Sequence, residues 1–343
     1  MDTQITYDFR SAKKAFSRIG IALVLFFVAT FAAQLIIAYA GEMFFPKFFD
    51  RAFTYTEVVF ISSLTMYLVG VPVFYLAVKG LDTFEGTVAK CSAKTFFVAF
   101  VISYSLTYIG QMIGDYLAAF IYDRFDVLLV SESIEIVSNI SWVEALVFSV
   151  IIGPFFEVLV FRKWIIDRTR GYGEKLSVIF SALMFAFFHT SIQQFFYTFF
   201  VGLLYGYLYT RKGKLIYCYL LHAAFNFFGA VVPLLFTAFV PDYDKFLELA
   251  LTSSDFDKLY SMVEANAMGY GAIALYSLLT VAMSFVGIFW FSKRVRNLRF
   301  ERAAFEIPKD NEAMTAFVNI GVGLFVLFAV AYPFLSMAAE KLL

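Results

Sequence analysis

The sequence predicts an all-α fold, a polytopic bundle of transmembrane helices with about nine spans. The first observation is composition, because 61% of the residues are hydrophobic and 16% are charged, against about 45–50% and about 25% in soluble domains. The second is that the apolar residues gather in blocks of roughly the 20 residues that cross a bilayer. These blocks cover about residues 18–40, 57–79, 95–121, 141–161, 176–190, 193–210, 215–239, 269–292 and 315–338.

The first block follows a polar, basic stretch and is long enough to span, so we expect a membrane helix there rather than a cleaved signal peptide. The fifth and sixth blocks are short and are joined by the uncharged link HTSIQQ, residues 189–194. They fit either two full crossings or a shallow hairpin inside the bundle, and we favour the hairpin. Gly202 and Gly206 in the sixth block predict close helix packing.

Charge alternates between the loops along the chain. Lys and Arg gather at the N-terminus and in every even-numbered loop, whereas acidic residues such as Asp123, Asp126, Glu132 and Glu135 gather in the others. Basic loops face the cytoplasm, so we expect a multi-pass protein of the cell membrane, with its N-terminus cytoplasmic and its C-terminus external. The acid-rich segment 241–267 predicts a solvated cap with a short surface helix. The formal net charge is zero, so nothing indicates a nucleic-acid partner, and the bilayer is the expected surrounding.

Three predicted spans carry polar groups that are costly in a bilayer. Glu157 lies in the fourth span, His189 in the fifth, and His222 with Asn226 in the seventh. A charged side chain at the centre of a span costs about 2.5–3.5 kcal/mol, so such a residue is a functional hypothesis by default. The chain has only two histidines, and both lie in these apolar segments. Together the three segments predict one functional site.

Spacing indicates where these side chains project. His222 and Asn226 are four residues apart and therefore share one helix face. Glu157 and Arg162 are five apart, roughly 140° around an α-helix, so we expect them to face different ways. Glu157 would then face the two histidines.

Arg162 adjoins Lys163 at the expected cytoplasmic boundary. We expect it to support the orientation of the span. Its guanidinium would either reach lipid phosphate or pair with Asp167.

A carboxylate, two imidazoles and an amide are the parts of a hydrolase. Glu157 could act as general base on a water that His189 orients. His222 and Asn226 could donate hydrogen bonds to a developing oxyanion, worth about 2.7–4 kcal/mol per donor. Glu157, His189 and His222 also resemble a catalytic zinc set with an open position. Either no cofactor or a single divalent metal, zinc being one possibility, therefore fits these residues.

Three short motifs carry a family resemblance. The segments EVLVFR (157–162), FAFFH (185–189) and HAAFN (222–226) follow one another in the chain. They are similar to the motifs E-E-x-x-x-R, F-x-x-x-H and H-x-x-x-N/D of the CAAX protease and bacteriocin-processing (CPBP, or Abi) family of intramembrane proteases. The glycine-containing stretch FFVGLLYGYLYTRKGKLIY (199–217) also resembles the family.

The resemblance implies an intramembrane endopeptidase that is either glutamate- or metal-dependent. Its substrate would be a membrane-embedded or lipidated protein or peptide, of the prenylated or leader type. In the residue-by-residue match, Glu157 activates water, His189 assists it, His222 and Asn226 hold the oxyanion, and Arg162 supports the site. The implied organisation is a catalytic core over 141–231. Transmembrane helices flank it over 1–140 and over 232–343, the latter with the acidic external loop.

Val158 departs from the family pattern, because the second motif Glu would stand there. An i, i+4 Glu–Arg pair is a local salt bridge, so the absent carboxylate would have partnered Arg162. The departure keeps an alternative open, a non-catalytic membrane immunity or scaffold protein that retains the protease fold. A transporter would show paired intramembrane charges and an inverted repeat, and neither is visible in the sequence.

Overall fold

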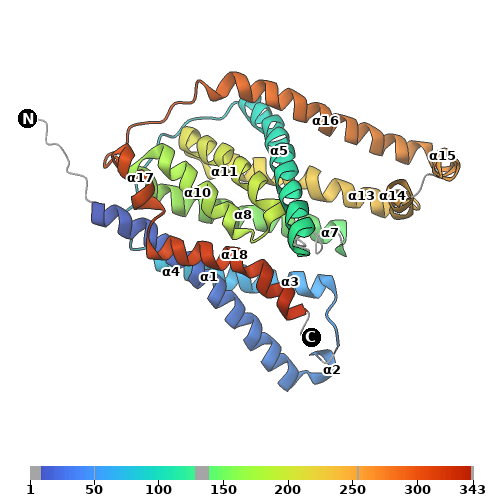
Figure 1. The fold of residues 1–343 in the computed structure, drawn as a ribbon, viewed down its shortest axis with the longest axis horizontal. Helices are drawn as coiled ribbons and strands as arrows, with labels where there is room; N and C mark the ends of the chain where they lie inside the picture. The colour runs from blue at the N-terminus through green and yellow to red at the C-terminus, as the bar shows by residue number, and fades with distance from the viewer. Residues whose placement is uncertain (1–8, 50, 128–138, 253–254, 341–343) are drawn as a thin grey trace, which may run out of the picture.

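The computed structural model of the protein describes residues 9–49, 51–127, 139–252 and 255–340, and all of its regular elements are helices (Figure 1). Glu132 and Glu135 of the predicted acidic loop lie outside these ranges. Four elements are π-helical and are labelled η like the single 3₁₀ turn. The elements are α1 Phe9–Phe44, α2 Pro46–Phe49, α3 Tyr55–Thr65, η1 Met66–Gly70, α4 Val71–Val78, α5 Ala93–Phe125, α7 Trp142–Glu144, η2 Ala145–Ile152, α8 Gly153–Val158, η3 Leu159–Ile166, α9 Asp167–Thr169, η4 Arg170–Tyr172, α10 Glu174–Phe188, α11 Ile192–Lys212, α12 Leu215–Asn226, η5 Phe227–Val231, α13 Val232–Phe239, α14 Tyr243–Thr252, α15 Phe256–Ala265, α16 Ala267–Val295, α17 Lys309–Ala316 and α18 Ile320–Glu340.

The structure supports six or seven of the nine expected spans. Six helical stretches are long and apolar enough to cross a membrane, and α17 with α18 form a seventh if this pair, bent by 61°, counts as one span. The fifth and sixth expected spans correspond to α10 and α11 and are not among them. With 15 residues, α10 is about 22 Å long, shorter than the roughly 30 Å hydrocarbon core. The protein is a multi-pass membrane protein built as a helical bundle.

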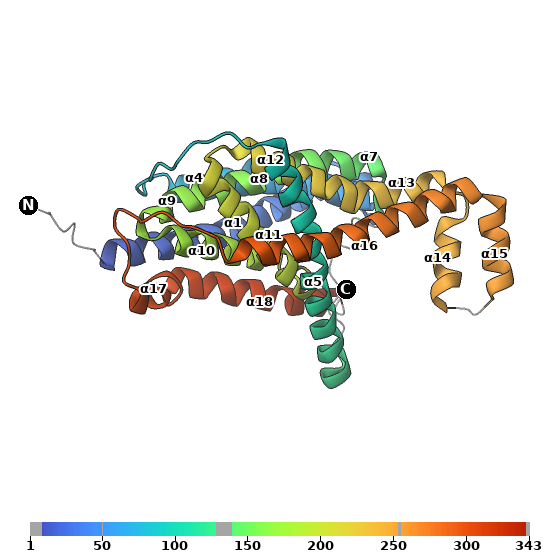
Figure 2. The same ribbon diagram turned by 90° about the horizontal axis from the view of Figure 1, so that it is seen from above.

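Three apolar clusters pack the bundle, and the two larger ones surround the segment α8–η3. The first joins α1, α4, η3, α10 and α18, with Phe16, Phe74 and Phe180 at its centre. The second joins α5, α8, α11 and α12, with Tyr205 and Leu221 fully buried. Figures 1 and 2 show α1 and α18 side by side on one side of the bundle and α16 on the other. The segment α8–η3 and the helix α10 therefore lie between two packed layers.

Proline marks three of the four π-helical segments. Pro72, Pro154 and Pro233 each stand two residues after the last residue of η1, η2 and η5, respectively. A proline has no N–H to donate to the carbonyl four residues earlier, and its ring crowds that carbonyl. The preceding turn therefore widens towards the i→i+5 pattern of a π-helix. The widened turns flank α8 and follow α12 directly.

Helices α10 and α11 form a tight hairpin inside the bundle, with α11 packed against α5 as well. A side chain at Gly202 would meet Ala182 at 3.1 Å, and one at Gly206 would meet Val178 at 3.1 Å. The predicted close packing of these glycines is confirmed. The hairpin turns through Thr190, which has a φ of +49°, and Ser191 caps α11 by accepting a hydrogen bond from the Gln194 N–H.

A buried ion-pair group ties the C-terminal segment to the hairpin. Glu174 accepts from Arg170 at 2.8 Å and also from Arg211, and its carboxylate receives the backbone N–H of Glu301 at 2.6 Å. The backbone N–H of Phe305 donates to Gly171 at 2.8 Å. The chain between α16 and α17 is thus fixed against the end of the long helix that contains η3.

The acid-rich segment 241–267 carries the expected surface helix, which is α14. A second helix that the sequence did not predict, α15, packs beside it. Both lie together at one end of the molecule, far from α17 (Figures 1 and 2).

Candidate active site

Three neighbouring elements carry the four predicted site residues. Glu157 lies near the end of α8, His189 is the C-cap of α10, and His222 and Asn226 are on α12, with Asn226 as its last residue. Helix α12 packs against α8, η2 and η3, and α10 packs against η3. The long broken helix η2–α8–η3 therefore brings Glu157 next to α10 and α12.

Glu157 and His222 come together across the α8–α12 contact. The Nε2 atom of His222 lies 3.6 Å from Oε2 of Glu157. The side chain of Glu157 keeps 25% of its surface accessible, against 10% for His222. A carboxylate that is partly accessible and adjoins an imidazole can hold a water molecule, which is the first requirement of a hydrolytic site.

Phe185 lies between the histidines and the arginine. Its ring centroid is 4.7 Å from that of His189 and 6.1 Å from that of His222, both in edge-on geometry. The guanidinium carbon of Arg162 stands 4.9 Å from the same ring centroid. One aromatic ring thus contacts three of the side chains that the motifs single out.

His189 has one ring nitrogen fixed by its own helix. Its Nδ1 lies 2.9 Å from the carbonyl oxygen of Phe185. A carbonyl only accepts, so Nδ1 carries the proton, and the Nε2 atom of the neutral ring is left as an acceptor. This tautomer suits a residue that receives a hydrogen bond from water.

Asn226 links α12 to η2. Its side-chain amide donates a hydrogen bond of 2.7 Å to the carbonyl oxygen of Ser149. An asparagine amide has a second N–H and a carbonyl oxygen. The bond to Ser149 therefore fixes the orientation of Asn226 without exhausting its donors.

Arg162 departs from the sequence prediction. Its side chain is 1% exposed, donates to the Ser181 hydroxyl at 3.1 Å and stacks on Phe185. It therefore does not reach lipid phosphate. Asp167 pairs instead with Lys163 at 2.8 Å and accepts from the Tyr209 hydroxyl at 2.9 Å.

The reason for this error is the winding of η3. We placed Arg162 with α-helical geometry, whereas Leu159–Ile166 is π-helical, and residues five apart nearly align in a π-helix. Arg162 is therefore turned towards Ser181 and Phe185 on α10, whereas Glu157 contacts His222 on α12. Among the described residues the two charges form no ion pair with each other.

Val158 occupies an apolar part of the core. It is 3% exposed and packs in the second cluster with Ile166, Tyr205 and Leu221. The Nε atom of Arg162, four residues later in the chain, is buried without a hydrogen-bond partner in the described structure. The family motif has its second carboxylate at position 158, where this chain has an apolar side chain.

Sequence reasoning missed three side chains around Glu157 and Arg162. Tyr67 stacks on Phe156 with a centroid distance of 4.6 Å and lies within electrostatic range of Glu157. Tyr197 on α11 is also within that range. Ser181, which holds Arg162, in turn donates to the Phe161 carbonyl at 2.6 Å. The chain has 21 tyrosines, so no pattern singled these two out.

Within the part of the chain that the structure describes, no three His, Cys, Asp or Glu side chains are grouped so as to hold a metal ion. Glu157, His189 and His222 are all in that part. Their arrangement therefore gives no support to the zinc-like set that the residue types allowed.

Comparison with known families agrees with the motifs. Residues 139–228 match the family described as type II CAAX prenyl endopeptidase Rce1-like. This segment is an Rce1-like domain of the CPBP (Abi) CAAX protease family, and it contains Glu157, His189, His222 and Asn226. No curated protein and no solved structure matches the chain.

Proposed function

We propose that the protein is an intramembrane endopeptidase that cleaves a peptide bond with a water activated by Glu157. The observation that carries the proposal is the 3.6 Å contact between the partly accessible Glu157 carboxylate and His222. It lies inside the segment that matches the CAAX protease family. A buried structural carboxylate would be closed to water, whereas a general base needs access to it.

The chemistry divides between four side chains. Glu157 takes a proton from water, and the hydroxide oxygen attacks the scissile carbonyl carbon. His189 accepts a hydrogen bond from that water through Nε2. The N–H groups of His222 and Asn226 donate to the oxyanion of the tetrahedral intermediate. When the C–N bond breaks, Glu157 returns its proton to the leaving amine, so the carboxylate is regenerated.

The substrate class follows from the membrane setting. We propose a membrane-embedded or lipidated protein or peptide, of the prenylated or leader type, because Glu157, His222 and Asn226 lie on candidate membrane spans and the matching family is described as a CAAX prenyl endopeptidase. The catalytic core extends over 141–231, between helices of 1–140 and 232–343. From the basic loops we propose that the N-terminus is cytoplasmic and the C-terminus external. Seven spans and a non-crossing α10–α11 hairpin keep the same sidedness as nine crossings.

The test is cleavage by the purified protein in lipid. A fluorogenic peptide with a C-terminal prenylcysteine motif and its non-prenylated counterpart are compared on the wild type, Glu157→Ala and His222→Ala. We expect cleavage by the wild type and none above background by the variants. If the variants cleave as the wild type does, the protease proposal fails.

Val158 favours a second candidate function, a non-catalytic membrane immunity or scaffold protein. An apolar residue where the family has a carboxylate leaves Arg162 without its motif partner. This candidate predicts that the wild type cleaves neither peptide, and that a phenotype of gene deletion is rescued equally by the wild type and by Glu157→Ala.

A further inference from the structure

An apolar cavity lies outside the candidate active site, between α5, α10, α11 and α16. Its volume is about 600 Å³. Side chains from α5 and α11 form most of its wall. The apolar residues that line it are Val98, Ala99, Ile102, Leu106, Val178, Ile179, Phe200, Leu203, Leu204, Leu208, Phe291, Val295, Leu298 and Phe300.

Three cationic side chains line the same cavity, and no acidic one does. Lys94 is the second residue of α5, Lys175 is the second residue of α10, and Arg294 is next to the last residue of α16. All three are exposed. Three helix ends therefore bring positive charge to one end of the cavity, while the remainder is apolar.

The depth of the cavity fits one leaflet of a bilayer. Leu106 lies twelve residues beyond Lys94 on α5, which is about 18 Å along a helix. One leaflet contributes roughly half of the 30 Å hydrocarbon core. An acyl chain that lies along α5 would thus have its headgroup at the level of the cations.

We propose that this cavity is a binding site for an anionic phospholipid of the adjoining leaflet. The headgroup phosphate binds among Lys94, Lys175 and Arg294, and one acyl chain fills the apolar part along α5 and α11. The side-chain amide of Asn297 and the hydroxyl of Tyr207 also line the cavity and are available to headgroup oxygens. A zwitterionic lipid would bring a quaternary or primary ammonium to the same three cations and is disfavoured.

The site is separate from the proposed chemistry. Lys175, Val178 and Ile179 belong to the beginning of α10, whereas His189 follows its end. Fourteen residues separate Lys175 from His189, about 21 Å along the helix. A lipid in the cavity would therefore contact the hairpin and α16 without entering the space beside Glu157.

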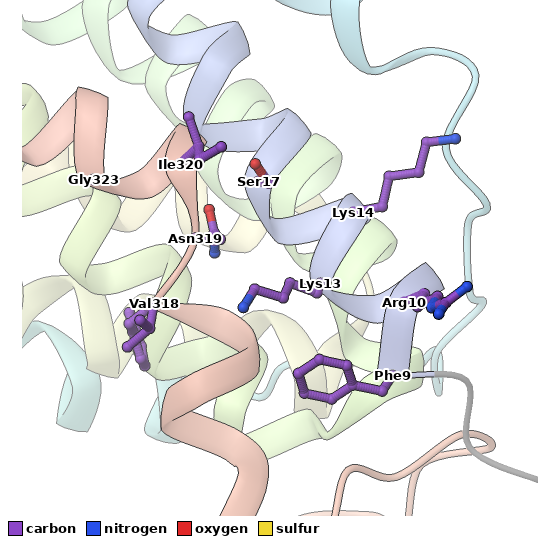
Figure 3. A pocket seen from close by; sticks show the side chains of 10 residues that line it. Phe9, Arg10, Lys13, Lys14, Ser17, Val318, Asn319, Ile320 and Gly323 are labelled. Atoms are coloured by element: carbon purple, nitrogen blue, oxygen red, sulfur yellow. The ribbon is translucent and has the colours of Figure 1, made fainter.

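A second cavity, of about 830 Å³, is more open than the first. Arg10, Lys13 and Lys14 line it together with residues around the α17–α18 bend. Figure 3 shows Lys13 directed towards Asn319, while Arg10 and Lys14 point to the other side of α1. Its cations do not converge on one point, so it lacks the arrangement of the first cavity.

The experiment measures lipid retention by the full chain. Protein in nanodiscs of phosphatidylcholine with a minor fraction of phosphatidylglycerol is released into the gas phase, and bound lipids are counted by native mass spectrometry. We expect one tightly retained phosphatidylglycerol. Each cation near the surface strengthens anionic lipid binding about fivefold, so Lys94→Gln/Lys175→Gln/Arg294→Gln should weaken retention about a hundredfold.

Two further variants test whether the position of the cations and the free volume of the cavity matter. Lys79→Gln/Arg299→Gln/Lys309→Gln removes three exposed cations that do not line the cavity and should retain the lipid as the wild type does. Leu203→Trp leaves the cations in place but fills the apolar part, and it should also lose the lipid. Equal retention of the two lipids by the wild type, or equal loss in the two triple variants, overturns the proposal.

Discussion

The Nε2 atom of His222 lies 3.6 Å from Oε2 of Glu157, and the two residues come from helices that meet only in the folded bundle. The motifs that contain Glu157 and His222 are far apart in the sequence, so sequence spacing alone does not bring the two side chains together. The contact depends on α12 packing against α8 and on the widened turns that flank α8. The candidate site is therefore a property of the helix packing, and variants can separate its chemistry from its stability.

Replacing Glu157 with Gln should abolish the base and spare the fold. Removal of a general base lowers the rate about 10²–10⁴-fold, so kcat for peptide cleavage should fall by that factor. The melting temperature should stay the same or rise, because a neutral amide costs less to bury than a carboxylate. Thermal unfolding in nanodiscs and steady-state kinetics measure the two effects.

The matched control is Glu144→Gln at the start of the same long helix. Glu144 caps that helix through Ser141, and Gln also fits a capping box. Its kcat should match the wild type. A Glu157→Gln protein that keeps wild-type kcat would remove Glu157 from the mechanism.

Asn226→Ala should act on the transition state more than on substrate binding. Loss of one oxyanion donor costs about 10²–10³ in kcat, so kcat should fall by that factor with KM little changed. The variant also leaves the Ser149 carbonyl without its donor. Asn319→Ala is the control, because Asn319 caps α18 far from the site, so it should lower the melting temperature without changing kcat. A rise in KM at constant kcat for Asn226→Ala would contradict an oxyanion role.

Metal removal should leave cleavage unchanged. The described residues contain no group of three metal-ligating side chains, and the buried guanidinium of Arg162 contacts the same aromatic ring as both histidines. A dication beside it would be repelled. Protein dialysed against a chelator and then assayed in metal-free buffer should keep its kcat. Loss of activity that zinc restores would contradict this expectation and favour a metal-dependent mechanism.

Composition and motif order were sufficient to predict the class of fold, the surface helix α14 and the close packing of Gly202 and Gly206. The structure supports six or seven spans rather than the expected nine, because α10 has only 15 residues and α11, although it has 21, is not apolar enough to count as a span. Contacts such as the stacking of Tyr67 on Phe156 depend on which helices become neighbours. No periodicity in a single sequence encodes that choice.

The expectation that Arg162 reaches lipid phosphate or pairs with Asp167 assumed 3.6 residues per turn throughout, whereas Leu159–Ile166 is π-helical. One signal was present in the sequence, because Pro72, Pro154 and Pro233 each follow a π-helical segment by two residues. A proline inside an apolar span removes a backbone hydrogen bond and disturbs the turn before it, although Pro333 inside α18 has no π-helical turn before it. The segment η3, Leu159–Ile166, has no such proline, so this signal does not reveal its winding.

Arg162→Lys should destabilise the protein although it keeps the charge. Lysine cannot reproduce both the planar contact with Phe185 and the bond to Ser181. A desolvated cation–π contact is worth about 2 kcal/mol, so the free energy of unfolding should fall by about 1–3 kcal/mol. Lys163→Gln is the neighbouring control, since its exposed pair with Asp167 is worth about 0–1 kcal/mol. Equal melting temperatures for the two variants would mean that the buried contacts of Arg162 contribute nothing.

Val158→Glu should preserve or raise both stability and activity, because the second glutamate of the family motif would stand at position 158, and the Nε atom of Arg162 four residues later is buried without a hydrogen-bond partner in the described structure. A buried donor without a partner costs about 1–3 kcal/mol, and a new carboxylate would relieve that cost while it pairs with Arg162. Val158→Lys has a similar length and opposite charge, and it should fail to fold because it places a second cation beside Arg162. Melting temperature and kcat are measured for both variants and for Val158→Met, which keeps the site apolar. If Val158→Glu is as damaging as Val158→Lys, or if it folds but loses cleavage, the absent motif carboxylate is not the natural partner of Arg162.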